Sequence, residues 1–172
     1  MEFFDAVKNR YSYRGTFLDT PIPREHLEMI LDAGIRAPSG CNTQTTSFVA
    51  VADPAMRAEL AKIVDRPYMQ SAQAVILVIS DYVEPYPGAN FELEDYAAAT
   101  QNLLLAITAL GYASVWVDGH LKHDGRAEAI AKLLGMEKPG RTVRAALPIG
   151  VPAEAGGVQN SRLPFEQRAK II

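Results

Sequence analysis

The segment from Phe91 to Leu110 places the strongest demand on the fold, because it predicts a long helix that is apolar on almost every side. From Ala97 to Leu110 apolar side chains lie around nearly the whole helix, and Gly111 is typical of the position after a helix. Such a helix must be buried on all sides. Small alanines at 97–99 and at 106 allow a second helix to approach closely. In a chain this short, that helix can belong to a second subunit.

The rest of the sequence predicts strands and helices that alternate along the chain. Strands are expected at 48–52, 74–79, 113–117 and 143–149. Helices are expected at 2–9, 27–37, 54–64 and 127–134, and Asp53 followed by Pro54 is typical of a helix N-terminus. The strand at 74–79 is apolar on both faces, as a central buried strand is. The order indicates an α/β or α+β sheet covered by helices.

Nothing in the chain marks a linker, so we expect a single domain over residues 1–172. The regular pattern ends at Val151, and residues 151–172 are expected to form a tail that lies along another surface. With 172 residues, 48% of them hydrophobic and 22% charged, the chain is long and apolar enough to bury a core.

Charge and hydropathy exclude several classes of partner. The net charge is −3 without a basic block, so we expect no nucleic-acid partner. The longest apolar run, Ala74 to Ile79, is far too short to span a membrane. The N-terminus shows no cationic segment followed by an apolar one, so a cytoplasmic location is expected.

The usual catalytic signatures are missing from the sequence. It contains no GxGxxG, no GxxxxGK[ST], no GxSxG and no HExxH. His26 is expected to face solvent, and the polar segment 118–124 is interpreted as a surface loop rather than a metal site. The single cysteine, Cys41, is interpreted as a small buried thiol rather than a nucleophile.

The segment from Arg10 to Arg14 is more informative. In an extended segment alternate side chains share a face, so Arg10, Ser12 and Arg14 point the same way. Two guanidinium groups and a hydroxyl suit a phosphate or another polyanionic group. The alternative is that these arginines complement the negative end of the preceding helix and face solvent.

A second candidate is the loop that follows the helix at 27–37. Pro38 is stiff, Gly40 permits close backbone approach, and Asn42 and Gln44 carry side-chain amides. Such amides can pair with a ring that presents alternating donors and acceptors. The alternative is an ordinary capped loop between a helix and a strand.

Taken in order, these segments resemble the nitroreductase-like family of FMN flavoproteins. The opening NRYSYRGTFLDTPIPREHLEMILDAGIRAPSGCNTQ is similar to that family's R-x-S-x-R, followed by P-[VI]-x-x-x-[LI] and a helix that ends in A-P-S-x-x-N-x-Q. Downstream, AAATQNLLLAITALGYASVWVDG resembles its central helix, strand and turn. ALPIGVP and NSRLPFE resemble its last strand and its C-terminal tail.

The resemblance implies an α+β fold of the α/β-sandwich type, with a central, mostly antiparallel sheet flanked by helices. It also implies an intertwined homodimer whose tail, 151–172, wraps the partner subunit. FMN sites then lie at the interface between two copies.

The resemblance also assigns roles to individual positions. Arg10 and Ser12 stand where the family holds the FMN phosphate, and Arg162 stands where the tail adds another phosphate contact. Arg14 corresponds to a basic residue near the pyrimidine edge of the flavin.

Two further groups correspond to the flavin ring. Pro38, Ser39, Gly40, Asn42 and Gln44 belong to a loop that reaches FMN across the dimer interface. The turn that faces flavin N5 corresponds to Asp118 and Gly119, and Trp116 lies at a place near the flavin that is often smaller. The sequence departs from the family at Thr45-Thr46, where Pro-Trp is frequent, and at Asn160, where some members have lysine.

The implied function is an FMN-dependent oxidoreductase that takes hydride from NAD(P)H and reduces a nitroaromatic, a quinone or a similar small acceptor by ping-pong kinetics. The reactive centre is the flavin, so no side chain is expected to act as a catalytic residue. Two alternatives remain open. One is a flavin-binding store or sensor without turnover, and the other is an interaction domain that has kept the fold and lost the flavin.

Overall fold

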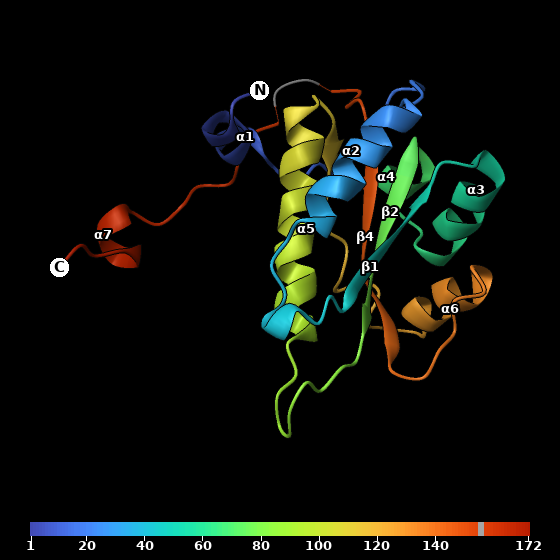
Figure 1. Ribbon diagram of the computed structural model, residues 1–172. Helices are drawn as coiled ribbons and strands as arrows, with labels where there is room; N and C mark the ends of the chain where they lie inside the picture. Colours follow the sequence, from blue (N-terminus) through green and yellow to red (C-terminus); the bar gives the residue numbers. More distant parts are fainter. Residues whose placement is uncertain (155–156) are drawn as a thin grey trace.

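A four-stranded antiparallel sheet forms the centre of the molecule, as the computed structural model in Figure 1 shows for residues 1–154 and 157–172. The strands lie in the order β1-β2-β4-β3. Their bounds are Thr46–Val51 for β1, Ala74–Asp81 for β2, Ala113–Ser114 for β3 and Arg141–Gly150 for β4. Each neighbouring pair is antiparallel, which confirms the mostly antiparallel sheet implied by the resemblance.

Helices cover both faces of the sheet (Figure 1). The first face carries α2, Arg24–Ile35, and the long helix α5, Glu92–Ala109. The other face carries α3, Pro54–Ile63, together with α4, Pro67–Gln70, and α6, Arg126–Leu133. The helix α1, Phe3–Asn9, lies beside α5, and α7, Phe165–Arg168, lies in the tail. The chain is therefore α+β, with a sheet between two helical layers.

Strand β2 holds the two layers together because it is apolar on both faces. Leu77 and Ile79 pack into the cluster with α3, α4 and α6, whereas Ile76 and Val78 pack into the cluster with α2 and α5. Side chains alternate between faces along a strand, so one continuous apolar run supplies both cores. This confirms the central buried strand that the sequence predicts.

Helix α5 is only partly enclosed by its own chain. Tyr96, Leu103 and Ile107 are buried against the sheet. On another side a groove of about 270 Å³ lies between α1, α2 and the C-terminal half of α5. In α1 the side chain of Phe4 is 72% exposed. The expectation of burial on every side is therefore not met within one copy.

Several local predictions need correction. Helix α2 spans Arg24–Ile35 rather than 27–37, and Arg36 follows it as the C-cap. Strand β3 is shorter than 113–117, because Val117 pairs with Ala146 as an isolated bridge. His26 does not simply face solvent, because its Nδ1 lies 2.7 Å from Tyr112 Oη.

Cys41 was expected to be buried, and the structure shows it exposed. It lies in the short 3-10 turn η1, Gly40–Asn42, and its φ is 52°. The left-handed turn directs the thiol out of the core.

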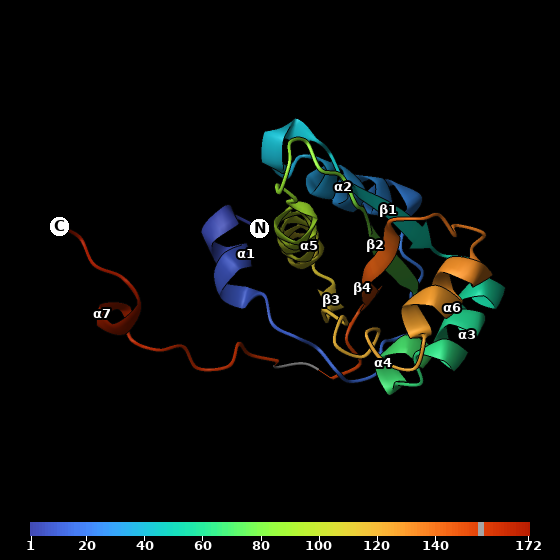
Figure 2. The ribbon, with the colours of Figure 1, turned by 90° about the horizontal axis from the view of Figure 1, so that it is seen from below.

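The tail leaves the body of the molecule, as Figure 2 shows. Gln159 Nε2 donates to Val7 O at 2.7 Å, which ties the start of the tail to α1. Beyond it, Leu163 and Phe165 are exposed, as are Ile171 and Ile172. Residues 155 and 156 of the predicted tail lie outside the described residues. Among the described residues, no helix is long and apolar enough to cross a membrane.

Candidate functional site

Three arginines from the two ends of the chain converge on one hollow. Arg10 follows α1, Arg14 follows four residues later, and Arg162 comes from the tail. They line a small cavity of about 50 Å³ with Ser12. Its other lining residues are Tyr11, Val158, Gln159 and Asn160. The structure thus brings together the phosphate-site residues named from the sequence.

The positive charge of this hollow is not neutralised within the chain. In residues 1–154 and 157–172, none of the three guanidinium groups forms an ion pair. Burial lowers the pKa of Arg10, and the nearby charge of Arg162 lowers it further. Unpaired guanidinium groups held close together favour a bound polyanion, and forked donors suit phosphate oxygens. The residues present therefore fit the phosphate group of FMN.

The hollow continues along the edge of the sheet. Ser12 forms a parallel bridge to Ser114 at the end of β3, and Tyr13 N donates to Ser114 O at 2.9 Å. From Ser114 the chain runs through Trp116 to the turn at Asp118 and Gly119, a path of about 13 Å if extended. Asp118 Oδ2 lies 3.4 Å from Lys122 Nζ in a partly exposed ion pair.

Two buried polar atoms on this edge lack partners among the described residues. Trp116 Nε1 and Ser114 Oγ are both shielded from solvent without a hydrogen bond. The Trp116 ring packs edge-on against Tyr96 of α5, with the ring centres 6.2 Å apart. A buried polar atom without a partner costs free energy, so these two atoms at the sheet edge need an explanation.

The second predicted group, from Pro38 to Gln44, forms a tight loop between α2 and β1. Pro38, Asn42 and Gln44 are exposed, and Ser39 and Gly40 are partly covered. Gln44 N donates to Ser39 Oγ at 3.1 Å, and Thr43 Oγ1 donates to Gly40 O at 2.8 Å. A cavity of about 70 Å³ lies beside the loop, next to Asp95 and Ala99 of α5. The backbone N–H groups of residues 40 and 42–44 are satisfied within the chain, whereas Asn42 and Gln44, which carry the side-chain amides, are exposed.

Within one copy, this loop and the arginine hollow do not meet. The loop contacts the first turn of α5 through Asp95, while α1 lies along the last turns of the same helix. The 18 residues of α5 span about 27 Å. Figure 1 shows η1 and α1 near opposite ends of α5.

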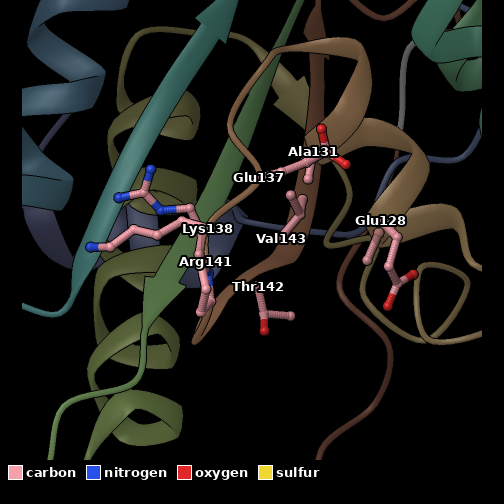
Figure 3. A pocket seen from close by; sticks show the side chains of 9 residues that line it. Glu128, Ala131, Glu137, Lys138, Arg141, Thr142 and Val143 are labelled. Carbon is pink, nitrogen blue, oxygen red and sulfur yellow. The ribbon is translucent and has the colours of Figure 1, made fainter.

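A further hollow outside these groups lies between α6 and β4 (Figure 3). Its volume is about 410 Å³. Lys138 and Arg141 line it, but both pair with Asp81 of β2. Glu128 and Glu137 lie at its other side, as Figure 3 shows. None of the residues predicted from the sequence lines this hollow.

The described residues contain no cluster of three or more metal-ligating side chains. His120 lies in the loop before α6, where burial and then the charge of Arg126 lower its pKa. The lowered pKa favours the neutral imidazole of His120.

An antiparallel sheet between two helical layers, with an arginine-lined hollow at its edge, defines an α+β protein. A sequence model described as the nitroreductase family matches residues 7–67 and 64–151. The chain therefore belongs to the nitroreductase family.

Individual relatives agree with this assignment. A protein of Methanothermobacter thermautotrophicus, whose assigned name is NADH dehydrogenase/NAD(P)H nitroreductase, is 31% identical over 165 residues, which cover 93% of this chain and 82% of the relative. An NADPH-dependent oxidoreductase of Staphylococcus epidermidis is 26% identical over 95% of this chain and 70% of its own length. A protein of Desulfovibrio desulfuricans, named as a nitroreductase and crystallised in complex with FMN, superposes with a TM-score of 0.81. It is 28% identical, and the match covers 100% of this chain and 98% of that one.

The sequence reasoning missed the residues that support the site from behind. Asp95 receives hydrogen bonds from the loop at Gly40 and Thr45, although it lies 55 residues from Gly40 in the sequence. The sequence signal was a group of three acidic residues, Glu92, Glu94 and Asp95, in the first turn of a helix that is mostly apolar further along.

Proposed function

We propose that this chain is an FMN-dependent oxidoreductase that takes reducing equivalents from NADH or NADPH and passes them to a nitroaromatic, a quinone or a similar small acceptor. The observation that carries the proposal is the unneutralised arginine hollow beside the edge of the sheet. Family membership, relatives named as NAD(P)H oxidoreductases and a relative crystallised with FMN support it.

The hollow supplies the phosphate contacts in this proposal. Arg10 and Arg162 donate charge-assisted hydrogen bonds to the phosphate, and Ser12 adds a hydroxyl. When bound, FMN supplies the centre that accepts hydride from a nicotinamide and donates it to the second substrate. Arg14 lies next to the phosphate contacts, and its fixed positive charge stabilises negative charge that develops at the pyrimidine edge.

The flavin site is shared between two copies in this proposal. The arginine hollow and the turn at Asp118 and Gly119 come from one chain, and the loop 38–44 comes from the other. The placement of the loop and the hollow near opposite ends of α5 supports this arrangement, since one copy does not bring them together. The domain then comprises residues 1–172, with the tail 151–172 lying across the partner subunit.

Trp116 shapes the pocket at the ring. Its indole packs edge-on against Tyr96 of α5. A large side chain at this place narrows the space for the second substrate, which favours small, flat acceptors.

The test is a visible spectrum of the purified protein without oxygen, recorded before and after NADH or NADPH is added. We expect flavin bands that bleach with at least one nucleotide and return when a quinone is added. Bands that persist with both nucleotides would instead indicate a flavin store or sensor. A protein that stays colourless after FMN is supplied would contradict the proposal.

The shared site has its own test. Sedimentation of the FMN-loaded protein is expected to give twice the 18.8 kDa chain mass. A monomer with FMN fully bound would refute the shared site.

A further inference from the structure

A buried carboxylate on α5 joins the two ends of the loop 38–44. Asp95 is 4% exposed. Its Oδ1 accepts from Gly40 N at 2.8 Å, and its Oδ2 accepts from Thr45 Oγ1 at 2.7 Å. One side chain therefore fixes the backbone at the start of η1 and the residue just before β1.

The loop needs such support because its backbone is strained. Cys41, Asn42 and Gln44 have φ values of 52°, 53° and 50°, in the left-handed region that favours glycine. Asparagine adopts this conformation more readily than cysteine or glutamine does. Backbone of this kind persists only where the surrounding structure holds it.

Packing and hydrogen bonding act together at Gly40. A Cβ at that position would lie 2.3 Å from Phe91 Cγ, so the loop backbone rests directly on the residue before α5. With the bond to Asp95, Gly40 is held by two residues of the same helix start. The loop therefore follows the position of that first turn.

The first turn of α5 is itself fixed to the sheet. Glu92 is buried and pairs with Arg144 of β4, and Ser80 Oγ of β2 lies 3.3 Å from Glu92 Oε2. The register of β2 and β4 shifts between Val78 and Ile79, which leaves Arg144 as the extra residue of a β-bulge. Bulges redirect a side chain, and here the redirected arginine reaches α5. Asp95 therefore lies on a helix turn that is fixed to the sheet.

The chemistry of Asp95 points to geometry rather than to stability. In residues 1–154 and 157–172 no lysine, arginine or histidine pairs with it. A buried carboxylate without a cation destabilises a fold unless hydrogen bonds and a helix N-terminus offset the loss of water. A carboxylate accepts from both donors as a charged group, whereas an amide would accept from Gly40 N without a charge and would require the Thr45 hydroxyl to accept from its NH₂.

We propose that Asp95 is a positioning residue that holds the loop 38–44 in its flavin-binding shape by accepting from Gly40 N and Thr45 Oγ1. The inference rests on the function proposed above, in which this loop contacts the flavin ring and the arginine hollow binds the phosphate. Asp95 therefore acts on the ring side of the site alone.

This division gives a sharp test, because riboflavin has the ring of FMN and lacks its phosphate. Dissociation constants for FMN and riboflavin are measured by fluorescence titration in Asp95→Asn and Thr45→Val. Both constants are expected to rise about 10- to 100-fold in Asp95→Asn, the range for one charge-assisted hydrogen bond, with their ratio unchanged. Thr45→Val removes one donor and is expected to show a smaller rise, which Thr45→Ser reverses because the hydroxyl returns.

Two further variants serve as controls for the FMN and riboflavin titrations. Glu94→Gln changes an exposed carboxylate next to Asp95 and is expected to leave both constants within about twofold. Arg10→Ala is expected to reduce the preference for FMN over riboflavin, which is the opposite signature. Partial unfolding of Asp95→Asn would also weaken both ligands equally, but it would speed amide exchange throughout the chain and not over residues 39–45 alone.

Amide hydrogen exchange of the flavin-free protein tests the support directly. Exchange over residues 39–45 is expected to be at least about 10-fold faster in Asp95→Asn than in Glu94→Gln. Unchanged exchange, or flavin affinities equal to those of the wild type, would overturn the inference while leaving the proposed function intact. If the wild type binds neither flavin, the proposed function fails, and the role assigned to Asp95 fails with it.

Discussion

Arg141 and Arg144 each face a carboxylate of their own chain, whereas Arg10, Arg14 and Arg162 face one another. Arg141 donates to both oxygens of Asp81 at 2.8 and 2.9 Å, and Arg144 pairs with Glu92. Among residues 1–154 and 157–172, no acidic side chain lines the hollow where the other three meet.

The pKa of an arginine is therefore shifted in opposite directions in the two regions. The hydrogen bond to Asp81 raises the pKa of Arg141, while burial and the charge of Arg162 lower the pKa of Arg10. In the first region the charge is satisfied inside the fold and contributes to stability. In the second region, burial and the repulsion between arginines disfavour the positive charge, which is available to an anion that binds from outside. This arrangement is typical of a functional site.

Breaking the best-buried internal pair is expected to have the largest effect on stability. In Arg144→Met, Glu92 stays buried without its partner, since its side chain is only 10% exposed. We expect unfolding to become easier by about 2–4 kcal/mol, somewhat below the value for a fully buried pair, since the Arg144 side chain is 23% exposed. Denaturant titration measures the change. The double variant with Glu92→Gln should recover part of the loss, and strictly additive effects would contradict the pairing.

Removing a charge from the arginine hollow is expected to weaken FMN binding and to leave the stability of the flavin-free fold almost unchanged. Arg10→Ala is expected to weaken FMN binding roughly 10- to 150-fold, because charge-assisted hydrogen bonds to the phosphate are lost. The free energy of unfolding without FMN should stay the same or rise slightly, since a repulsion with Arg162 is relieved. Arg24→Ala is the matched control, because Arg24 is exposed and pairs with Glu28. An unchanged FMN affinity in Arg10→Ala would remove the residue from the site.

Local patterns were enough to predict much of the fold. The apolar run of β2 predicted a strand buried on both faces, and Asp53 caps α3 by accepting from Met56 N at 2.8 Å. The hydrophobic pattern did not predict where β3 ends, because strand pairing and not hydropathy decides it. Val115 and Val117 are buried like strand residues, yet β3 ends at Ser114, because the ladder with β4 does not continue past it.

The site was predictable to the extent that its residues are close in sequence. The spacing of Arg10, Ser12 and Arg14 suited an anion site but left open that these arginines face solvent, whereas Arg162 entered only through the family resemblance. The structure ties the two segments together through Gln159 and Val7, a contact across 152 positions. The exposure of Cys41 and the support from Asp95 depend on loop dihedral angles and on a distant helix, and neither leaves a local pattern.

The smallest expected effect on stability comes from the more exposed of the two internal ion pairs, Arg141 with Asp81. The hydrogen bond from Arg141 lowers the pKa of Asp81, so the ionised carboxylate stabilises the fold above the pKa of the unfolded chain. That contribution is lost as the pH falls through the lowered pKa of the folded state. Asp81→Asn is expected to cost about 1 kcal/mol or less at pH 7, because the pair is partly solvated.

The difference between wild type and Asp81→Asn should begin to shrink near pH 4, where the carboxyl of the unfolded chain becomes protonated, and should reach zero only below the lowered pKa of the folded carboxyl. Denaturant titrations of both proteins between pH 7 and pH 3 measure it, and a difference that stays constant would assign the effect to packing. Asp81→Asn also removes the main acidic partner of Arg141, so Arg141 becomes unpaired, like Arg10. If Arg141 gains no affinity for FMN or inorganic phosphate, then one unpaired arginine is insufficient, and the convergence of three on one hollow is what makes the anion site.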